Sequence, residues 1–442
     1  MDALWMETVS LPRFPALRGD RKTDVLIIGG GMAGILCAWK LREAGVDCLL
    51  LEADRICGGV TAGTTAKITF QHGLCYDKMI REFGAEKARM YLDANRAALD
   101  GYRDLAARIS CDFEEKDAYV YAPDSREKIE RELAALDKIG YPAQFTDKLP
   151  LPFPVAGAVK FPRQAQFHPL KFAAALTRSL PSYEHTPVRQ MMSHAALTDT
   201  GTVTATKIIV ATHFPFINKH GWYFIKLYQH RSYLLALENG PDVDGMYLGE
   251  AENGMSFRNY KNFLLIGGGD HRTGKKGGGW WELEKFAGVH YPASPVRYRW
   301  AAQDCMTLDG IPYIGQYGRS TQELYVATGF NKWGMTSSMT AAMLLTDRVL
   351  GIENPYAPVF SPTRTTLRPQ LAVNLFEATA NLMTFSPKRC PHLGCALKWN
   401  PQEHSWDCPC HGSRFTARGK LLDNPATGNL KGTDTHDKPS EK

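Results

Sequence analysis

Two short stretches near the carboxyl end of the chain combine cysteine and histidine at spacings that suit a metal centre. Box one, Cys390–Cys395, has the pattern C-x-H-x-x-C, and box two, Cys408–His411, has the pattern C-x-C-H. Twelve residues lie between Cys395 and Cys408, so two adjacent loops can present their side chains to one site. Cysteine thiolates and histidine imidazoles at short spacings bind zinc, and two of each also hold a [2Fe–2S] cluster. The sequence therefore predicts a metal centre here.

The two boxes, together with the Gly412-Ser413 pair that follows box two, resemble the Rieske [2Fe–2S] domain over about residues 385–430. The resemblance implies two thiolate and two imidazole ligands, which are Cys390, Cys408, His392 and His411. A zinc knuckle is the alternative, because the same side chains suit tetrahedral zinc.

The two remaining cysteines of the boxes, Cys395 and Cys410, match a feature of the respiratory cytochrome bc type of Rieske protein. In that type the extra cysteines form a disulfide between the two loops, so the resemblance implies a Cys395–Cys410 disulfide. It also places the hydroxyl of Ser413 near the cluster, where a hydrogen bond would raise the reduction potential.

At the other end of the chain, a glycine-rich turn lies between a strand and a helix. Asp24–Ile28 is an apolar run typical of a buried parallel strand, and a helix is expected from Ala33 to about Ala44. A second strand, Asp47–Leu51, follows and ends at Glu52. The turn itself reads G-x-G-x-x-G, in which three glycines allow a tight turn, close approach to a pyrophosphate and close packing of helix on strand. These glycines are Gly29, Gly31 and Gly34, and Glu52 stands where an acidic group binds ribose hydroxyls.

Three later features favour FAD over NAD as the dinucleotide. They are a loop rich in small and hydroxyl residues (Gly58–Lys67), a strand ending in Ala-Thr (Thr204–Thr212), and the segments Thr307–Gly315, Leu324–Phe330 and Gly334–Thr336. This combination resembles the D-amino-acid oxidase (DAO) superfamily of FAD-dependent oxidoreductases over about residues 23–352. The resemblance implies further FAD contacts at Thr64, Thr65, Lys67, Gly329, Gly334, Met335 and Thr336.

The expected fold is an α/β protein with an added β domain. A discontinuous Rossmann-type FAD-binding domain (about 20–70, 186–216 and 299–352) would be combined with an α+β substrate domain (about 71–185 and 217–298). A linker (353–384) would lead to a shortened Rieske-type β domain (385–432) and a disordered polar tail (433–442). The Rieske domain is expected to be shortened because Leu371–Met383 has a helical pattern where a Rieske domain has its first strands.

Composition excludes several classes of protein. The chain has 442 residues, 22% of them charged, and a net charge of +6, without a Lys/Arg-rich run that would indicate a nucleic-acid partner. No stretch approaches the roughly 20 apolar residues of a membrane span. The amino terminus lacks the pattern of a signal peptide, so we expect a cytoplasmic protein. The six cysteines outside the boxes are expected to be reduced thiols.

In this superfamily FAD takes a hydride from a carbon that bears nitrogen, so the expected substrate is a small amine or amino acid. A substrate carboxylate would need a cation, preferably arginine. Weak candidates for substrate binding or catalysis are Lys67, Arg231, Tyr233, Arg258, His271 and Arg272, and Lys332 and Trp333 could line the pocket.

A cluster that accepts single electrons beside a flavin predicts a dehydrogenase whose electrons leave through the cluster to an acceptor protein or quinone. Two alternatives stay open. The chain could be an oxygen-using oxidase with a structural Rieske domain, or a redox sensor or electron carrier without turnover. A Rieske oxygenase is disfavoured, because we find no convincing set of two histidines and one carboxylate for mononuclear iron.

Overall fold

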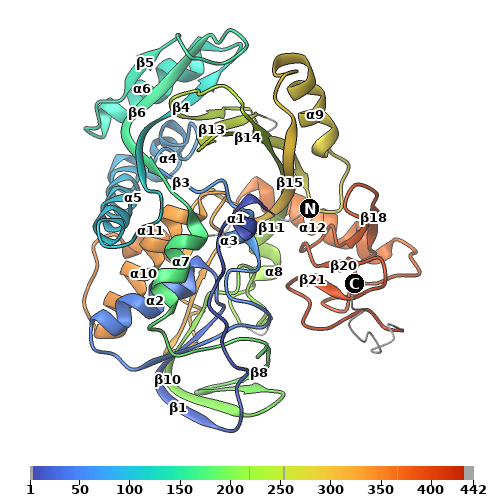
Figure 1. Ribbon diagram of the computed structural model, residues 1–442. Coiled ribbons are helices and arrows are strands. Elements are labelled where there is room, and N and C mark those ends of the chain that lie inside the picture. Colours follow the sequence, from blue (N-terminus) through green and yellow to red (C-terminus); the bar gives the residue numbers. More distant parts are fainter. Residues whose placement is uncertain (1–2, 219, 252–253, 366, 433–442) are drawn as a thin grey trace.

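The structure is a computed structural model that describes residues 3–218, 220–251, 254–365 and 367–432 (Figure 1). Within these residues the chain forms three β-sheets, of eight, nine and four strands. No helix in the described part is long and apolar enough to cross a membrane. The polar tail, expected to be disordered, lies outside the described residues.

The first sheet is largely parallel and contains the dinucleotide-binding unit. Its main strand order is β16-β17-β10-β1-β2-β7, and β9 and β8 extend it beside β10. The strands are β1 (Arg21–Ile28), β2 (Cys48–Leu51), β7 (Ser182–Tyr183), β8 (Val188–Met192), β9 (Ala195–Thr198), β10 (Thr202–Val210), β16 (Tyr313–Gln316) and β17 (Leu324–Thr328). Two helices, α2 (Met32–Glu43) and α10 (Gly334–Leu350), pack against each other beside it.

The predicted strand–helix–strand unit is confirmed to within three residues at each boundary. β1 pairs in parallel with β2, with Ile28 opposite Leu51, and also with β10. The apolar run of β1 is buried because strands lie on both sides of it and helices cover the sheet. The carboxyl ends of these strands therefore meet at one edge, where the glycine-rich turn begins.

The second sheet is mixed and has the order β15-β11-β14-β13-β12-β4-β6-β3, with β5 beside β6. Its strands are β3 (Lys67–Ile68), β4 (Glu114–Ala122), β5 (Gln144–Thr146), β6 (Gly157–Gln166), β11 (Leu227–Glu238), β12 (Met246–Gly249), β13 (Ser256–Tyr260), β14 (Phe263–Arg272) and β15 (Val296–Thr307). β13 and β14 form a hairpin that turns at Lys261, where φ is 52°.

Most of the remaining helices lie around these two sheets. They are α1 (Leu4–Thr8), α3 (Val60–Gly63), α4 (Tyr76–Phe83), α5 (Ala85–Ala106), α6 (Arg126–Lys138), α7 (Pro169–Thr177), α8 (Tyr223–Lys226), α9 (Gly279–His290) and α11 (Ala357–Phe360). Sheet membership differs from the expected domain pieces at three points: residues 182–183 lie in the first sheet, and residues 67–68 and 299–307 lie in the second.

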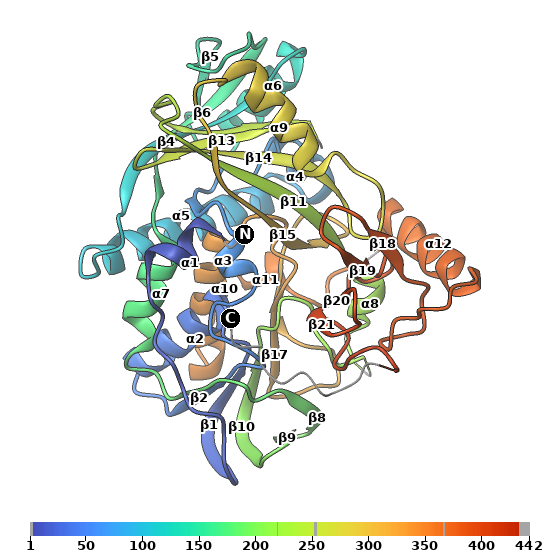
Figure 2. The ribbon, with the colours of Figure 1, turned by 45° about the vertical axis from the view of Figure 1, so that its right-hand side comes forward.

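The third sheet is antiparallel, with the order β18-β19-β20-β21. It consists of β18 (Lys398–Asn400), β19 (Ser405–Asp407), β20 (Arg414–Thr416) and β21 (Leu421–Asp423). The helix α12 (Pro369–Met383) precedes it, as the sequence predicts. Figures 1 and 2 show this carboxyl-terminal domain, in orange and red, beside one end of β11 and β15.

Candidate functional site

A cavity of about 1350 Å³ opens between the first sheet, the second sheet and the carboxyl-terminal domain. Most of the residues expected to bind FAD line it, namely Gly29, Gly31, Glu52, Thr64, Thr65, Lys67, Gly329, Gly334 and Met335. Gly34 and Thr336 lie behind this wall. The hydroxyl oxygen of Thr336 lies 2.9 Å from Nε2 of His72, with which it shares a hydrogen bond. The same hydroxyl donates to the carbonyl of Thr69.

The glycine-rich turn is held by Glu52. The backbone N–H of Gly30 donates to Oε2 of Glu52 at 2.7 Å, and the N–H of Asp54 donates to Oε1 at 2.9 Å. Burial raises the pKa of Glu52, while these N–H groups act in the opposite direction. At Gly34 a β-carbon would lie 1.9 Å from the carbonyl oxygen of Gly29, so only glycine fits there.

Replacing Gly34 with alanine should therefore deform the turn and lower the FAD content of the purified protein. The expected loss is at least tenfold in affinity, because a displacement of about 1 Å in a binding loop is costly. The matched control is Gly288→Ala on α9, where a β-carbon meets nothing within 4 Å. Flavin absorbance per protein measures the result, and normal FAD content in Gly34→Ala would contradict it.

Two residues that were expected to contact FAD, Lys67 and Thr65, are held in place by hydrogen bonds that involve a backbone carbonyl. Lys67 donates from Nζ to the carbonyl of Tyr247 at 2.7 Å, and burial, with the charge of Arg258, lowers its pKa to about 7. Arg258 donates from Nη1 to the carbonyls of Thr65 (2.7 Å) and Ala66 (3.0 Å). The expected substrate role of Arg258 is therefore replaced by a structural one, in which it fixes the loop that carries Thr64 and Thr65.

The strand β11 presents its two faces to different partners. Because side chains alternate along a strand, His230 and Ser232 line the cavity, whereas Gln229 and Arg231 face the carboxyl-terminal domain. The neighbouring strand β15 behaves in the same way: Asp304 lines the cavity, and Gln303 donates to the carbonyl of Gly412 at 2.9 Å. This part of the second sheet is therefore the partition between the cavity and the carboxyl-terminal domain.

This alternation corrects the interpretation of the other substrate candidates. Arg231 forms a buried ion pair with Glu403, and the Tyr233 hydroxyl donates to Glu403 at 3.1 Å. His271 stacks on the ring of Tyr233, and Arg272 donates from Nε to the carbonyl of Pro409 at 3.3 Å. Arg231 and His271 lie one residue out of phase with His230 and Asp270, which face the cavity, and they hold the carboxyl-terminal domain to the sheet. Tyr233 lines the cavity and bonds to Glu403, and Arg272, although it lies opposite His230, contacts the carboxyl-terminal domain beyond the end of the sheet.

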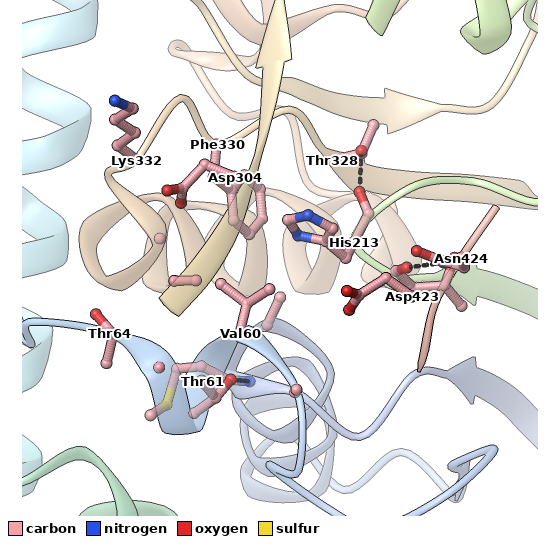
Figure 3. Close-up of a pocket in the computed structure, with 18 of the residues that line it drawn as sticks. Val60, Thr61, Thr64, His213, Asp304, Thr328, Phe330, Lys332, Asp423 and Asn424 are labelled. Atoms are coloured by element: carbon pink, nitrogen blue, oxygen red, sulfur yellow. Dashed lines mark hydrogen bonds between the residues drawn. The ribbon is translucent and has the colours of Figure 1, made fainter. Parts of the chain in front are cut away.

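Sequence reasoning missed the polar groups that do face the cavity from this sheet. They are His230, Asp270 and Asp304, and they lie near Lys332, which pairs with Asp270. Figure 3 shows Asp304 and Lys332 at one end and His213 between Asp304 and the Asp423–Asn424 pair in that view. Strand phase groups His230 with Ser232 in the sequence, but it does not say that this set faces the cavity, and the position of Asp304 opposite His230 is seen only in the folded chain.

The two Cys/His boxes form loops of matching geometry. The N–H of Cys390 donates to the carbonyl of Cys395, and the N–H of Cys408 donates to that of Ser413, both at 2.9 Å. Each loop turns at a glycine with positive φ, 80° at Gly394 and 83° at Gly412. Cys395 and Cys410 are joined by a disulfide that links the loops.

The side chains left free by this disulfide have the donor atoms that a Rieske cluster requires. Nδ1 of His392 and Nδ1 of His411 are buried and have no hydrogen-bond partner among the described residues, and the two rings lie 4.9 Å apart. Burial lowers the pKa of His392 to about 4 and that of His411 to about 3, so both are neutral, as ligands must be. Cys408 hydrogen-bonds to the sulfur of Cys390 and thereby lowers the pKa of Cys390 to about 7, although burial opposes this. The Ser413 hydroxyl also bonds to this sulfur.

Comparison with known proteins decides the family. The family model described as FAD dependent oxidoreductase (DAO) matches residues 24–348, and the model of the Rieske [2Fe-2S] domain matches residues 369–434. The chain belongs to the DAO family of FAD-dependent oxidoreductases and carries a Rieske domain at its carboxyl end. A Bacillus subtilis protein described as "Putative Rieske 2Fe-2S iron-sulfur protein YhfW" is 34% identical, and the alignment covers 98% of this chain and 97% of that protein.

Further comparisons agree with each half of this flavoenzyme. Glycine oxidase from Geobacillus kaustophilus has a similar structure (TM-score 0.65, 22% identity, 78% of this chain and 99% of that chain). So does L-proline dehydrogenase from P. horikoshii (TM-score 0.66, 16% identity, 78% and 98%). Over 42 residues the chain is 50% identical to cytochrome b6-f complex iron-sulfur subunit 2 of Trichormus variabilis, which is 10% of this chain and 24% of that subunit.

The family therefore assigns FAD to the cavity and a [2Fe–2S] cluster to the boxes. The two unpartnered Nδ1 atoms and the adjacent Cys390 and Cys408 sulfurs fit this cluster. The disulfide removes two of the six possible ligands, and the four that remain would suit zinc as well, so it is the match to the Rieske family that decides for the cluster.

Proposed function

We propose that this flavoenzyme is an amine or amino-acid dehydrogenase that passes electrons from FAD through its own Rieske cluster to an external acceptor. When bound, FAD supplies hydride acceptance from a carbon next to nitrogen, and the cluster supplies single-electron acceptance. The named relatives with solved structures act on glycine and on L-proline by their titles, and both are amino acids.

The observation that carries this proposal is the pair His213-Phe214. His213 lines the cavity. Phe214, the next residue, has its ring centroid 6.5 Å from that of His392 and 6.2 Å from that of His411. Two consecutive residues thus connect the wall of the cavity to both histidines of the cluster site.

A second contact chain joins the same two sites. Nε2 of His213 lies 2.9 Å from Oε1 of Gln229, and Gln229 packs so closely on Gly412 that a β-carbon there would be 2.4 Å from Cγ of Gln229. Asn424, from the Rieske domain, donates to the carbonyls of Thr212 and Phe214. The histidine edge of the cluster site is therefore buried against the cavity wall, which suits transfer within the chain.

The rest of the site supports turnover of a small substrate. The cavity wall is formed partly by Rieske residues 420–424 and 426–429, so the Rieske domain helps to exclude water from the cavity. An electron carrier without turnover would need only the FAD-binding part of this cavity, whereas polar groups also line the wall formed by β11, β14 and β15. We therefore favour the dehydrogenase over the carrier.

Replacing Phe214 with leucine removes the ring that lies between the cavity wall and the two histidines. We expect electron transfer from FAD to the cluster to slow by about tenfold or more, because small errors in the placement of reacting groups lower rates strongly. Reduction of FAD by substrate should proceed at the parent rate. The matched control is Phe224→Leu, whose ring also contacts His411 but whose chain neighbours do not line the cavity. Stopped-flow absorbance with rapid-freeze EPR measures both phases, and an unchanged cluster phase in Phe214→Leu would contradict the path.

The function itself is tested by anaerobic mixing with glycine, D-amino acids, N-methyl amino acids and polyamines, followed by flavin bleaching. We expect at least one class to bleach FAD and the cluster to become EPR-active within the same turnover. In a second mixing step the reduced enzyme meets oxygen. Rapid reoxidation of FAD by oxygen, with a cluster that stays EPR-silent throughout, would instead support an oxidase with a structural Rieske domain.

A further inference from the structure

The end of the cavity formed by β11, β14 and β15 contains more hydrogen-bond acceptors than the protein satisfies. Oδ1 of Asp270 is buried without a partner among the described residues, and so is Nδ1 of His230, whose side chain is more than nine-tenths buried. The carboxylate of Asp304 has one long contact there, 3.5 Å from the Ser232 hydroxyl. An unmet buried acceptor is costly, so these atoms indicate a ligand that donates hydrogen bonds.

Strand pairing places two of these groups opposite each other on one wall of the cavity. His230 on β11 lies directly opposite Asp304 on β15, so both side chains stand on the same face of the sheet. Asp270, near the end of β14, lines the same wall and pairs with Lys332. Burial lowers the pKa of His230 to about 3, with the charge of Lys332 acting in the same direction, so its ring is neutral and keeps one acceptor nitrogen.

The charge of this end is acidic once the existing pair is counted. One cation, Lys332, serves two carboxylates here: it pairs with Asp270, and its charge also acts to lower the pKa of Asp304, which has no ion pair of its own among the described residues. Burial raises the pKa of Asp304, and a bound cation would favour its ionised form. The two arginines that line the described cavity, Arg55 and Arg189, lie toward the dinucleotide end and are already paired with Glu184 and Asp199.

We infer that Asp304, Asp270 and His230 bind the protonated amino group of the substrate, so that the enzyme selects amines as cations and does not require a substrate carboxylate. This inference rests on the proposed function and names its substrate class. An ammonium group donates hydrogen bonds and carries a positive charge, and this wall offers two carboxylates and a neutral imidazole to receive it. A carboxylate placed there would face Asp304 across a cavity with a low dielectric constant.

The test uses two unreactive probes that share a tert-butyl group and carry opposite charges. tert-Butylammonium has no hydrogen on the carbon that bears nitrogen, so FAD cannot oxidise it, and pivalate is its carboxylate counterpart. Binding to the FAD-loaded protein is measured from the change in the flavin absorption spectrum and by calorimetry. We expect tert-butylammonium to bind at least tenfold more tightly than pivalate.

Asp304→Asn keeps the shape of the side chain and should weaken tert-butylammonium by about 30-fold or more, as when one partner of a buried charge pair is removed. Pivalate should bind this variant no more weakly than it binds the parent. Asp54→Asn is the matched control, since Asp54 also lines the cavity but has an exposed side chain at the dinucleotide end. Flavin content and thermal unfolding show whether each variant is folded.

Tighter binding of pivalate to the parent, or parent-like binding of tert-butylammonium to Asp304→Asn, would overturn the inference. These outcomes are separate from failure of the dehydrogenase proposal. If no amine bleaches FAD but the cation binds and depends on Asp304, the ammonium site stands and the proposed function fails. If amines bleach FAD and tert-butylammonium binds Asp304→Asn as tightly as it binds the parent, the proposed function stands and the ammonium site is rejected.

Discussion

Replacing Cys408 with serine should remove the [2Fe–2S] cluster and stop electron delivery to an external one-electron acceptor, while substrate continues to reduce FAD. Cys408 is buried and hydrogen-bonds to Cys390, and a serine hydroxyl does not ionise to replace its thiolate. The fall in acceptor reduction should exceed the roughly 10–100-fold effect of losing a group that only supports a ligand. Iron per protein, the EPR signal after reduction and the rate of cytochrome c reduction measure the result.

The matched control is Cys305→Ser. Cys305 is also buried, and burial raises its pKa to about 12, so it is a neutral thiol and not a thiolate. It should retain iron and parent-like acceptor reduction. Full iron content and a normal EPR signal in Cys408→Ser would show that the ligand set is misassigned.

The parts of the site that the sequence predicts correctly are carried by contiguous residues. The turn from Gly29 to Gly34 and the strand that ends at Glu52 need one short stretch of chain, and so does each Cys/His box. Their chemistry follows from local geometry, because glycines at these spacings indicate a dinucleotide-binding turn, and Cys and His at these spacings indicate a metal site. The fold class could therefore be predicted together with both cofactors.

The substrate side could not be predicted because β11 is buried on both faces. A strand with one solvent face shows which residues point inward, but Gln229, His230 and Arg231 are all polar and all buried. Period-two alternation separates them into two sets without saying which set faces the cavity. Arg231 looked suitable for a substrate carboxylate, whereas the structure pairs it with Glu403, which is 172 residues further along the chain.

The packing of the Rieske domain was also beyond the sequence. Phe214, Asn218 and Gln303 are unremarkable in their local segments, and their contacts with box residues depend on how separate sheets meet. Such contacts involve side chains more than 100 positions apart, for which local pattern carries no information. The route between the cofactors therefore became visible only in the folded chain.

Replacing Glu403 with glutamine should lower the free energy of unfolding of the holoprotein by about 3–5 kcal/mol, because removing one partner of a buried ion pair leaves a buried charge uncompensated. Glu403 bonds to Arg231, to Tyr233 and, at 2.8 Å, to Arg414, and its side chain is 10% exposed. The control is Glu284→Gln, since Glu284 forms an exposed pair with Arg299 and should cost about 0–1 kcal/mol. Urea unfolding followed by the visible circular dichroism of the cluster compares them, and equal losses in the two variants would contradict a buried anchor.

The same pair predicts how the difference depends on pH. Burial by itself raises the pKa of Glu403, but the charges of Arg231 and Arg414 outweigh it, so its folded-state pKa lies below its ordinary value. A carboxyl group whose pKa is lowered by folding stabilises the protein above its unfolded-state pKa, about 4.3, and this stabilisation is lost as pH falls through the folded-state value. The parent should therefore exceed Glu403→Gln in stability at neutral pH, and the gap should narrow only below about pH 4. A gap that closes between pH 8 and pH 6 would show that another titrating group, and not Glu403, anchors the Rieske domain.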